Sequence, residues 1–416
     1  MSGSLRILVC GGGIAGNAVA LQLLRAGIDV MVVERAAVPR PGGQAVDLRG
    51  PSRKVAERMG LMPGIRERQL HERGMMFVDE RGRKHAALPA EAFGGEGPVA
   101  DIEIARGDLN QVLLDQIAAL PAESGTLEYR YSEWVEKLVQ DRDAATVHFA
   151  SGATAEFDIV IGADGLHSDL REQVFGPHER FTEYLGAYIT FFTIPAPVDS
   201  GIESGWVGVC PVPGTAVAVR PDPDPATAMA IISTQIPADP ALRRDVAAQQ
   251  RLIRDRLAGH GWVIPQILSA MPDSPDFYFD EVTRVRMPLW SQGRVVLLGD
   301  AAYCGSPMTG MGTALALIGA YLLAGEIAAA PTDHVHALTR YENRLRPLVT
   351  EVQKGTETSV RLRHPDTRRG VRVALLFVAV LASRPAGLVM GLLTRLLAKR
   401  AEYPLPDYSL TAADRR

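Results

Sequence analysis

Short, uninterrupted runs of apolar residues mark the strands that this sequence predicts. Leu5–Cys10, Phe157–Gly162 and Arg294–Leu298 are the clearest runs, and each leads into a glycine-containing turn. Such runs are typical of strands that are buried on both faces of a parallel sheet. Because the three runs lie far apart in the chain, they predict one α/β domain assembled from separate segments.

Apolar positions at helical spacing follow the first run. Ile14, Ala18, Leu21 and Leu24 share one face of a helix that Gly27 ends, and Asp29–Val33 is then a second strand. The same reasoning predicts helices over Ser52–Met59, over Glu103–Ala119 with Asp108 as its cap, over about 245–258, and over a long Ala/Leu-rich stretch ending near Ala329.

The middle third of the chain has a different pattern. Its β-rich runs, bounded by Pro and Gly, predict a separate mixed or antiparallel sheet: Tyr188–Ile194, Trp206–Val212, Val217–Arg220 and Met229–Thr234. Met75–Asp79 predicts a further short strand. A smaller antiparallel excursion is predicted from Leu127–Tyr131, Val135–Leu138 and Thr146–Phe149.

The most hydrophobic stretch is 371–400, near the end of the chain. A membrane span needs about 20 uninterrupted apolar residues, whereas Arg384 and Pro385 divide this stretch in two. The sequence therefore favours two packed helices that are buried or face a partner. Weak attachment to a membrane surface is the second alternative, and a true membrane span is the least favoured.

Composition changes this picture little. The 416 residues are 47% hydrophobic and 22% charged, as in a soluble globular protein of two or three domains. A net charge of −4 argues against nucleic-acid binding. Cys10, Cys210 and Cys304 lack the spacing of metal ligands, so we expect buried small side chains and no metal site. The early first strand leaves no room for a signal peptide, which predicts a cytoplasmic protein.

A glycine-rich turn follows the first strand. Gly11, Gly13 and Gly16 have the G-x-G-x-x-G spacing, and Glu34 ends the second strand, where a carboxylate would accept ribose hydroxyls. An ordinary packing turn is the alternative. The two flanking strands and the acid favour a dinucleotide site.

Two further motifs follow the other buried runs. Asp164 opens D-G-L-H-S-D-L-R, and Asp300 lies in G-D-A-A, followed by P-x-x-G-x-G over Pro307–Gly312 and a helix. Carboxylates there would accept hydroxyls of a ribose or ribitol chain. The first amides of that helix would favour an anion, such as the N1/C2-carbonyl edge of a reduced flavin.

With these motifs in order, the chain resembles the class A flavin-dependent monooxygenases, the family of p-hydroxybenzoate hydroxylase, and particularly its tetracycline-modifying and polyketide-hydroxylase branch. The resemblance covers about residues 5–345. It implies an α/β fold with a discontinuous Rossmann-like FAD-binding domain (1–69, 101–178 and 285–345), an inserted β-rich substrate domain (70–100 and 179–284) and C-terminal helices (346–416).

The resemblance also implies an activity. NAD(P)H, with NADPH the expected form, would reduce FAD, and O2 captured as a C4a-hydroperoxide would hydroxylate an aromatic or polycyclic small molecule. Without a second G-x-G-x-x-G there is no separate nicotinamide domain, which fits a transient use of NAD(P)H. The alternatives are a related flavoprotein that performs Baeyer–Villiger oxidation, halogenation or saturation of an isoprenoid double bond, and a non-catalytic FAD-binding protein. A monomer and a homodimer both remain open.

Cofactor contacts are implied residue by residue. Glu34 and Arg35 would lie at the adenosine, Asp47 at the flavin ring and Asp300 at the ribitol. Arg40 matches a position linked to NADPH, Arg106 would contact FAD, Asp164 belongs to a motif that serves both cofactors, and Arg171 would brace the turn that carries Asp164. The full predicted set is Gly11, Gly13, Ile14, Ala15, Gly16, Glu34, Arg35, Arg40, Asp47, Arg106, Asp164, Asp300, Pro307, Gly310, Met311 and Gly312.

Three positions depart from the family pattern. Tyr303 replaces the frequent His after G-D-A-A, and Ala314 and Gly319 replace an Asn and an acid in the following helix. These changes leave backbone contacts to the flavin intact and alter the side chains near the ring.

The substrate pocket is the least defined part of the prediction. Tyr188, Phe192, Trp206 and Arg220 are its candidates, with core packing as the alternative for the aromatic residues. No side chain is assigned a catalytic role, because the flavin must activate O2. His167, His260 and His364 are isolated in the sequence and are interpreted as surface or structural residues.

Overall fold

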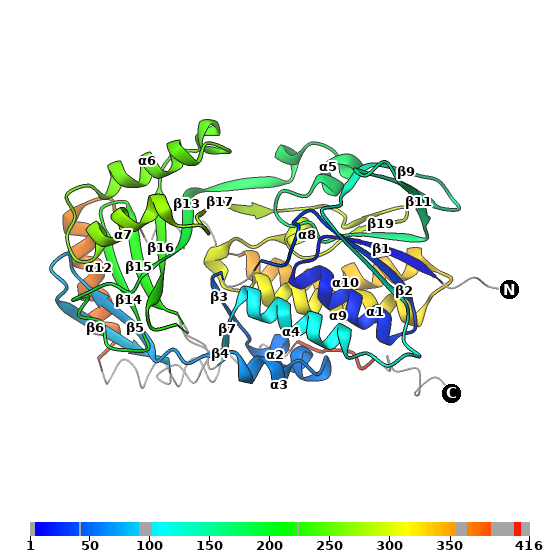
Figure 1. Cartoon of the computed structure of the whole chain (residues 1–416), viewed down its shortest axis with the longest axis horizontal. Coiled ribbons are helices and arrows are strands. Elements are labelled where there is room, and N and C mark those ends of the chain that lie inside the picture. Colours follow the sequence, from blue (N-terminus) through cyan, green and yellow to red (C-terminus); the bar gives the residue numbers. More distant parts are fainter. Residues whose placement is uncertain are drawn as a thin grey trace.

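The computed structural model describes residues 5–40, 43–90, 102–222, 224–354, 364–383 and 403–408. These residues form two lobes that lie side by side (Figure 1), one around a six-stranded sheet and the other around a seven-stranded sheet. The long strands β13 (Thr182–Pro195) and β17 (Tyr278–Val285) extend from one lobe into the other.

The six-stranded sheet contains the buried apolar runs. Its order is β18-β19-β12-β1-β2-β8, and all neighbours pair in parallel except β18 and β19. The strands are β1 (Arg6–Cys10), β2 (Asp29–Glu34), β8 (Leu127–Tyr131), β12 (Ile159–Gly162), β18 (Ser291–Gln292) and β19 (Val295–Leu297).

Leu127–Tyr131 forms a strand as predicted, but its antiparallel pairing was predicted wrongly, because β8 pairs in parallel with β2, from Val30 opposite Leu127 onward. An edge strand alternates apolar and polar residues whichever direction its neighbour runs, so alternation did not reveal the pairing. The following strands do pair antiparallel: β9 (Val135–Gln140), β10 (Ala145–Phe149) and β11 (Thr154–Phe157).

A second three-stranded sheet lies between the two lobes (Figure 1). It joins β3 (Ala45–Asp47), β7 (Glu103–Ala105) and β4 (Gln69–Leu70), all antiparallel. The helix predicted from Glu103 therefore begins later, as α4 (Arg106–Ala118), after an N-cap at Ala105 without a side-chain hydrogen bond. Asp108 lies in the first turn of α4 and is not its cap.

The second lobe is built on the mixed seven-stranded sheet, whose order is β17-β13-β16-β15-β14-β5-β6. Only β14 and β5 pair in parallel. Its remaining strands are β5 (Gly74–Val78), β6 (Lys84–Pro89), β14 (Trp206–Val212), β15 (Thr215–Pro221) and β16 (Thr227–Gln235).

The helices complete the two lobes. They are α1 (Ile14–Arg25), α2 (Gly50–Arg58), α3 (Met62–Glu67), α5 (Asp169–Phe175), α6 (Val246–Leu257), α7 (Ile264–Ala270), α8 (Asp300–Tyr303), α9 (Gly312–Ala329), α10 (His334–Gln353) and α12 (Arg368–Leu381). The continuous helix α10 runs across position 345, where the predicted flavin domain ends.

Helix α9 forms the centre of the first lobe. It packs against α1, α2 and α10, and nearly every residue along it is buried. Among the described residues it is the one helix whose length and composition would suit a membrane span, but 78% of it lies inside the protein. Its uniform apolarity therefore reflects a core position.

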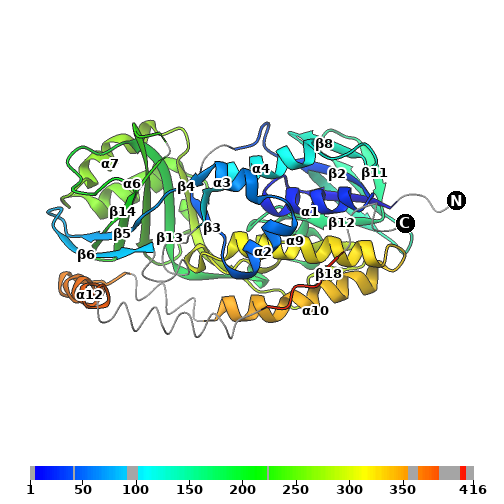
Figure 2. The ribbon, with the colours of Figure 1, turned by 90° about the horizontal axis from the view of Figure 1, so that it is seen from below.

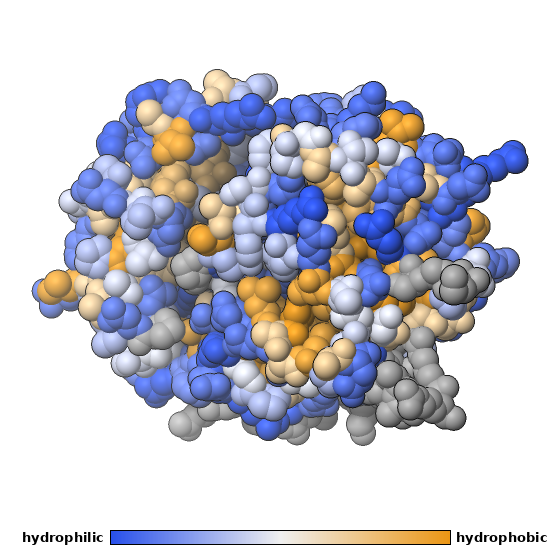
Figure 3. Space-filling model, turned by 45° about the vertical axis from the view of Figure 1, so that its right-hand side comes forward, coloured by the Kyte–Doolittle hydropathy of each residue, from blue (hydrophilic) through white to orange (hydrophobic). Residues whose placement is uncertain are grey.

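The described residues after α10 contact both lobes. Figure 2 shows α12 on the second lobe, whereas 403–408 runs along α9 and α10. Of the predicted pair of C-terminal helices, α12 is the first, and residues 384–400 lie outside the described part. On the face in Figure 3, apolar residues gather near the centre between hydrophilic margins.

Candidate functional site

Three turns that are far apart in the chain meet at the carboxyl-terminal edge of the parallel sheet. A Cβ on Gly11, whose φ is +108°, would lie 2.4 Å from the carbonyl oxygen of Ala163. A Cβ on Gly299 would lie 3.0 Å from the Cβ of Ala15. The first glycine turn therefore touches the turn that carries Asp164 and also the G-D-A-A turn.

Glu34 closes the first turn. Its two carboxylate oxygens accept hydrogen bonds from the N–H groups of Gly12 and Ala36, each at 2.7 Å. A carboxylate has about four lone-pair sites, so this one can still accept hydroxyl groups.

Two helices begin at this edge without a side-chain cap. Gly13 is the N-cap of α1 and Met311 the N-cap of α9, and neither first turn contains an acid. No atom lies within 4 Å of the position that a Cβ on Gly13 would take. The exposed N–H groups and the helix dipoles make both ends suited to an anion.

Asp300, the acid of the G-D-A-A turn, lies close to the start of α9. A Cβ on Gly312 would lie 3.8 Å from Asp300 Oδ1. Burial raises the pKa of Asp300, and the positive charge of Arg106 opposes that rise. Arg106 therefore lies close enough to Asp300 to interact with it electrostatically, and its predicted contact with FAD stays a prediction.

Asp47 lies on the other side of the same space. Its Oδ2 accepts from Arg49 Nη2 at 2.5 Å and would be 3.6 Å from a Cβ on Gly310. Burial raises the pKa of Asp47 to about 7, with Arg49 opposing the rise and the carboxylate of Glu103 reinforcing it.

Asp164 and Arg171 hold the second turn in place. Asp164 Oδ2 accepts from the N–H of Leu170 at 3.1 Å. The fully buried Arg171 donates to the carbonyl oxygens of Leu166 at 2.7 Å and Ala301 at 2.9 Å, which ties the second motif to the third. This geometry is the bracing predicted for Arg171.

Arg35 and Arg40 lie further out. Arg35 is exposed, forms an ion pair with Asp169, and places its guanidinium 5.3 Å from the ring centre of Trp134. Arg40 is exposed. Their predicted contacts with adenosine and NADPH stay predictions.

The aromatic pocket candidates pack into the core of the second lobe. Phe192 and Trp206 belong to one hydrophobic cluster, and Tyr188 stacks on Phe279 with the ring centres 4.9 Å apart. Their exposed fractions are 0%, 7% and 2%. Core packing, the alternative for these residues, is therefore where the structure places them. The sequence could not distinguish core packing from a place in the substrate pocket, because an apolar side chain on a strand looks the same in either case.

Arg220, the fourth candidate, reaches the other lobe. It is 3% exposed, donates to the carbonyl oxygen of Gly43 at 3.2 Å, and lies 3.7 Å from Glu72 Oε1. Gly43 lies just before β3, the strand that ends at Asp47. Arg220 therefore connects the β-rich sheet to the segment that carries Asp47.

The sequence matches the family of the FAD binding domain over residues 4–356. It is 38% identical to a flavin-dependent monooxygenase of Legionella longbeachae, over 85% of this chain and 88% of that protein. Its fold matches the crystal structure of the tetracycline destructase Tet(51), with a TM-score of 0.79, 33% identity, and coverage of 97% of this chain and 100% of that one. The chain belongs to the class A FAD-dependent monooxygenases.

The fold of this monooxygenase also matches that of Klebsiella pneumoniae HpxO complexed with FAD and uric acid, at a TM-score of 0.73 and 20% identity, over 95% of this chain and 98% of that one. FAD is the cofactor of the family, and NAD(P)H and O2 are its usual co-substrates. The residues present fit FAD, because two uncapped helix ends and the carboxylates of Glu34 and Asp300 share one sheet edge.

One group of polar residues in the monooxygenase was missed from the sequence. His167 Nε2 lies 3.0 Å from Asp280 Oδ1, and Asp280 Oδ2 accepts from the Tyr278 hydroxyl at 2.7 Å. The Asp280 hydrogen bond raises the pKa of His167. His167 is exposed, which agrees with its interpretation as a surface residue, but its partner Asp280 lies 113 residues away on β17 and no motif links the two. His364 is structural as expected: it is buried and lies 2.8 Å from Ser233 Oγ. His260 contacts Glu80 at 3.1 Å.

Two departures from the family pattern are explained by one contact. A Cβ on Gly319 would lie 2.1 Å from the Tyr303 hydroxyl, which is 3.1 Å from the Tyr341 hydroxyl. In this monooxygenase the larger Tyr303 therefore occupies the space that a side chain at 319 would need.

Proposed function

We propose that this monooxygenase hydroxylates an aromatic or polycyclic small molecule, with NADPH as reductant and O2 as the source of the oxygen atom. The meeting of the three turns supports the proposal most strongly, because it gives one extended site with groups suited to each part of FAD. The similarity to a tetracycline destructase over nearly the whole chain supports a polycyclic substrate.

Bound FAD would accept hydride and activate O2, which no side chain can do. The chain's own residues would hold it. Glu34 would accept ribose hydroxyls, the first amides of α1 would face the pyrophosphate, and Asp300 would accept ribitol hydroxyls. The first amides of α9 would stabilise negative charge on the flavin.

The substrate would lie between the β-rich sheet and the flavin. Tyr278 on β17 is a 41% exposed aromatic side chain on this side of the sheet. Burial raises its pKa, the carboxylate of Asp300 reinforces that rise, and the positive charge of Arg106 opposes it. Asp280 beside it and the buried Arg220 supply polar groups on the same side of the second lobe. Product release and substrate entry would then depend on the contacts between the lobes.

The test begins with the purified protein, which is expected to be yellow and to release FAD on denaturation. NADPH oxidation is then measured against a panel of phenols and polycyclic aromatics that includes a tetracycline. A substrate should accelerate NADPH oxidation, and its product should gain one oxygen atom by mass. NMR of that product separates ring hydroxylation from the ester of a Baeyer–Villiger oxidation. A colourless protein that does not bind added FAD would contradict the proposal.

The need for NADPH supports a cytoplasmic location, as the sequence suggests. A monomer and a homodimer are both compatible with the proposal. Sedimentation velocity of the FAD-loaded protein distinguishes them.

A further inference from the structure

Helix α12 carries an apolar stripe on the surface of the second lobe. Its inner residues Val371 and Leu375 are 9% and 4% exposed, where the helix packs against β6 and β14. Its outer large side chains Val373, Leu376, Phe377 and Val380 are 67%, 66%, 62% and 57% exposed. Their spacing of three and four residues places them on one face, so the helix presents a continuous hydrophobic stripe to solvent.

Arginines stand at the amino-terminal end of the same helix. Arg368, Arg369 and Arg372 form no ion pair with any carboxylate in the described part of the chain. The sequence from 359 to 400 holds nine Arg and Lys residues and one Asp, in a chain whose net charge is −4. In the described part of this segment, three arginines therefore stand beside the apolar stripe on the same helix.

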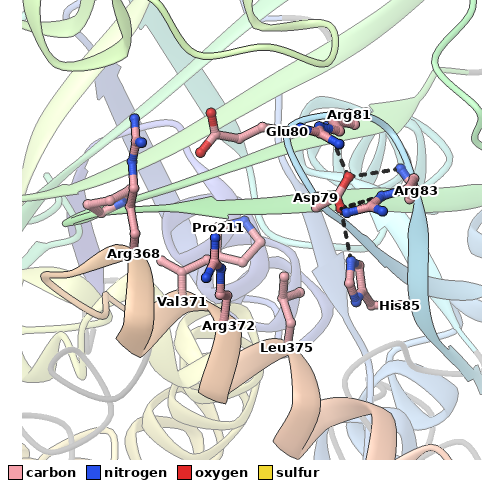
Figure 4. A pocket seen from close by; sticks show the side chains of 11 residues that line it. Asp79, Glu80, Arg81, Arg83, His85, Pro211, Arg368, Val371, Arg372 and Leu375 are labelled. Atoms are coloured by element: carbon pink, nitrogen blue, oxygen red, sulfur yellow. Dashed lines mark hydrogen bonds and ion pairs between the residues drawn. The ribbon is translucent and has the colours of Figure 1, made fainter.

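A cavity beside α12 adds to this charge. It has a volume of about 520 Å³ and lies between α12 and the hairpin of β5 and β6 (Figure 4). Four arginines line it against two carboxylates: Arg81, Arg83, Arg368, Arg372, Asp79 and Glu80.

One of those carboxylates is already neutralised locally. Asp79 accepts hydrogen bonds from Arg83 Nε at 2.9 Å and lies 3.1 Å from His85 Nε2. These contacts outweigh burial and hold the pKa of Asp79 well below its usual range. Arg81, Arg368 and Arg372 remain to attract an anion.

We propose that α12 docks on an anionic phospholipid membrane. The apolar stripe would enter the boundary between head groups and acyl chains, while the arginines at the helix start and cavity would contact lipid phosphates. A second copy of the chain fits this face less well, because a symmetric contact would bring like-charged arginines together.

The experiment uses the full-length, FAD-loaded protein and two kinds of vesicle. One contains phosphatidylcholine alone, and the other contains phosphatidylcholine mixed with phosphatidylglycerol. The protein is expected to co-sediment with the anionic vesicles and to remain in solution with the neutral ones. Added salt should release it, because screening weakens the arginine contacts.

Two exposed pairs test the two halves of the surface. Leu376→Gln with Phe377→Gln removes the stripe, and Arg369→Glu with Arg372→Glu reverses the charge. Each pair is expected to weaken vesicle binding at least about tenfold, since one arginine near an anionic surface contributes about fivefold. Leu289→Gln with Val335→Gln, at positions 61% exposed elsewhere, is the matched control and should bind as the unmodified protein does.

The flavin spectrum of every variant checks its folding independently of membrane binding. Three results would overturn the proposal: no co-sedimentation with anionic vesicles, unchanged binding of the Leu376/Phe377 variant, or a protein dimer in solution that this variant dissociates. The last result would make the face a contact between two copies. None of them depends on the substrate or on catalytic turnover.

Discussion

At the scale of single residues, Asp300 links the G-D-A-A turn to the start of α9. Replacing it with Ala removes a charged hydrogen-bond acceptor at the end of a buried strand, which is worth about 10- to 100-fold in affinity. We expect Asp300→Ala to lower FAD affinity by that factor while the protein stays folded. Isothermal titration with FAD and a thermal melt of the same sample measure both. Full FAD occupancy in this variant would refute the assigned site.

Asp47 is expected to make stability depend on pH. Its folded-state pKa of about 7 exceeds its ordinary value, so the folded protein binds a proton that the unfolded chain releases near pH 4. The free energy of unfolding of the flavin-free protein should therefore fall as pH rises from about 4 to about 7. Asp47→Asn should flatten the curve in this window. Urea unfolding across that range tests it, and parallel curves for the two proteins would contradict it.

At the scale of elements, the contact between α8 and α9 depends on a glycine. Gly319→Ala would place a methyl group against the Tyr303 hydroxyl, and overpacking of this kind costs about 1–3 kcal/mol. Tyr303→Phe removes the hydroxyl and should recover part of that loss in the double variant. Chemical denaturation of the single and double variants gives the coupling. Additive effects would show that the two side chains do not compete for space.

Arg220 on β15 belongs to a buried group of charges, 3.7 Å from Glu72 Oε1 and 3.6 Å from Asp222 Oδ1. Arg220→Ala would leave Glu72 buried beside Glu103 without its cation, which typically costs about 3–5 kcal/mol. Replacing both partners, as Arg220→Met with Glu72→Met, should restore most of the stability. Thermal unfolding of the three proteins measures this. A double variant no more stable than Arg220→Ala would argue against the pairing.

The elements that the sequence predicted best are those buried on all sides. The runs that became β1, β12 and β19 and the apolar helix α9 have one physical solution, since such segments must lie inside the protein. The sequence could not give the partner of β8, because one exposed face suits either strand direction. Nor could it give the start of α4, where Glu103–Ala105 pairs with two strands from other segments.

The candidate site divides in the same way. The turns of the site were predictable, because each depends on glycines at a fixed spacing within a few residues of one another. The contacts of Arg220 with Gly43 and of His167 with Asp280 join residues 177 and 113 positions apart, and no local pattern encodes them. The aromatic residues Tyr188 and Phe192 show the converse, because a strand's apolar side chains look alike whether they face a core or a ligand.

At the scale of the whole molecule, the segment 403–408 holds the first lobe together. Tyr408 packs on Gly325, and its hydroxyl donates to Glu326 Oε1 at 2.6 Å, a carboxylate that also pairs with Arg340 and Arg344. Tyr408→Ala should destabilise the protein by about 1–3 kcal/mol, because the half-buried ring and its hydrogen bond are both lost. Tyr408→Phe keeps the ring and isolates the hydroxyl. Unchanged melting temperatures for both variants would show that the segment is dispensable.

The parallel sheet also sets an order of events during protein synthesis. Ile7 in β1 pairs with Ile159 in β12, and Val160 pairs with Val295 in β19. One edge of β1 can pair with β2, which is made soon after it, but its other edge stays unpaired until β12 has been made, and β12 in turn waits for β19. The three turns of the cofactor site follow β1, β12 and β19, so they cannot meet until β19 has been made. A chaperone that shields β1 until then would improve the yield of yellow enzyme.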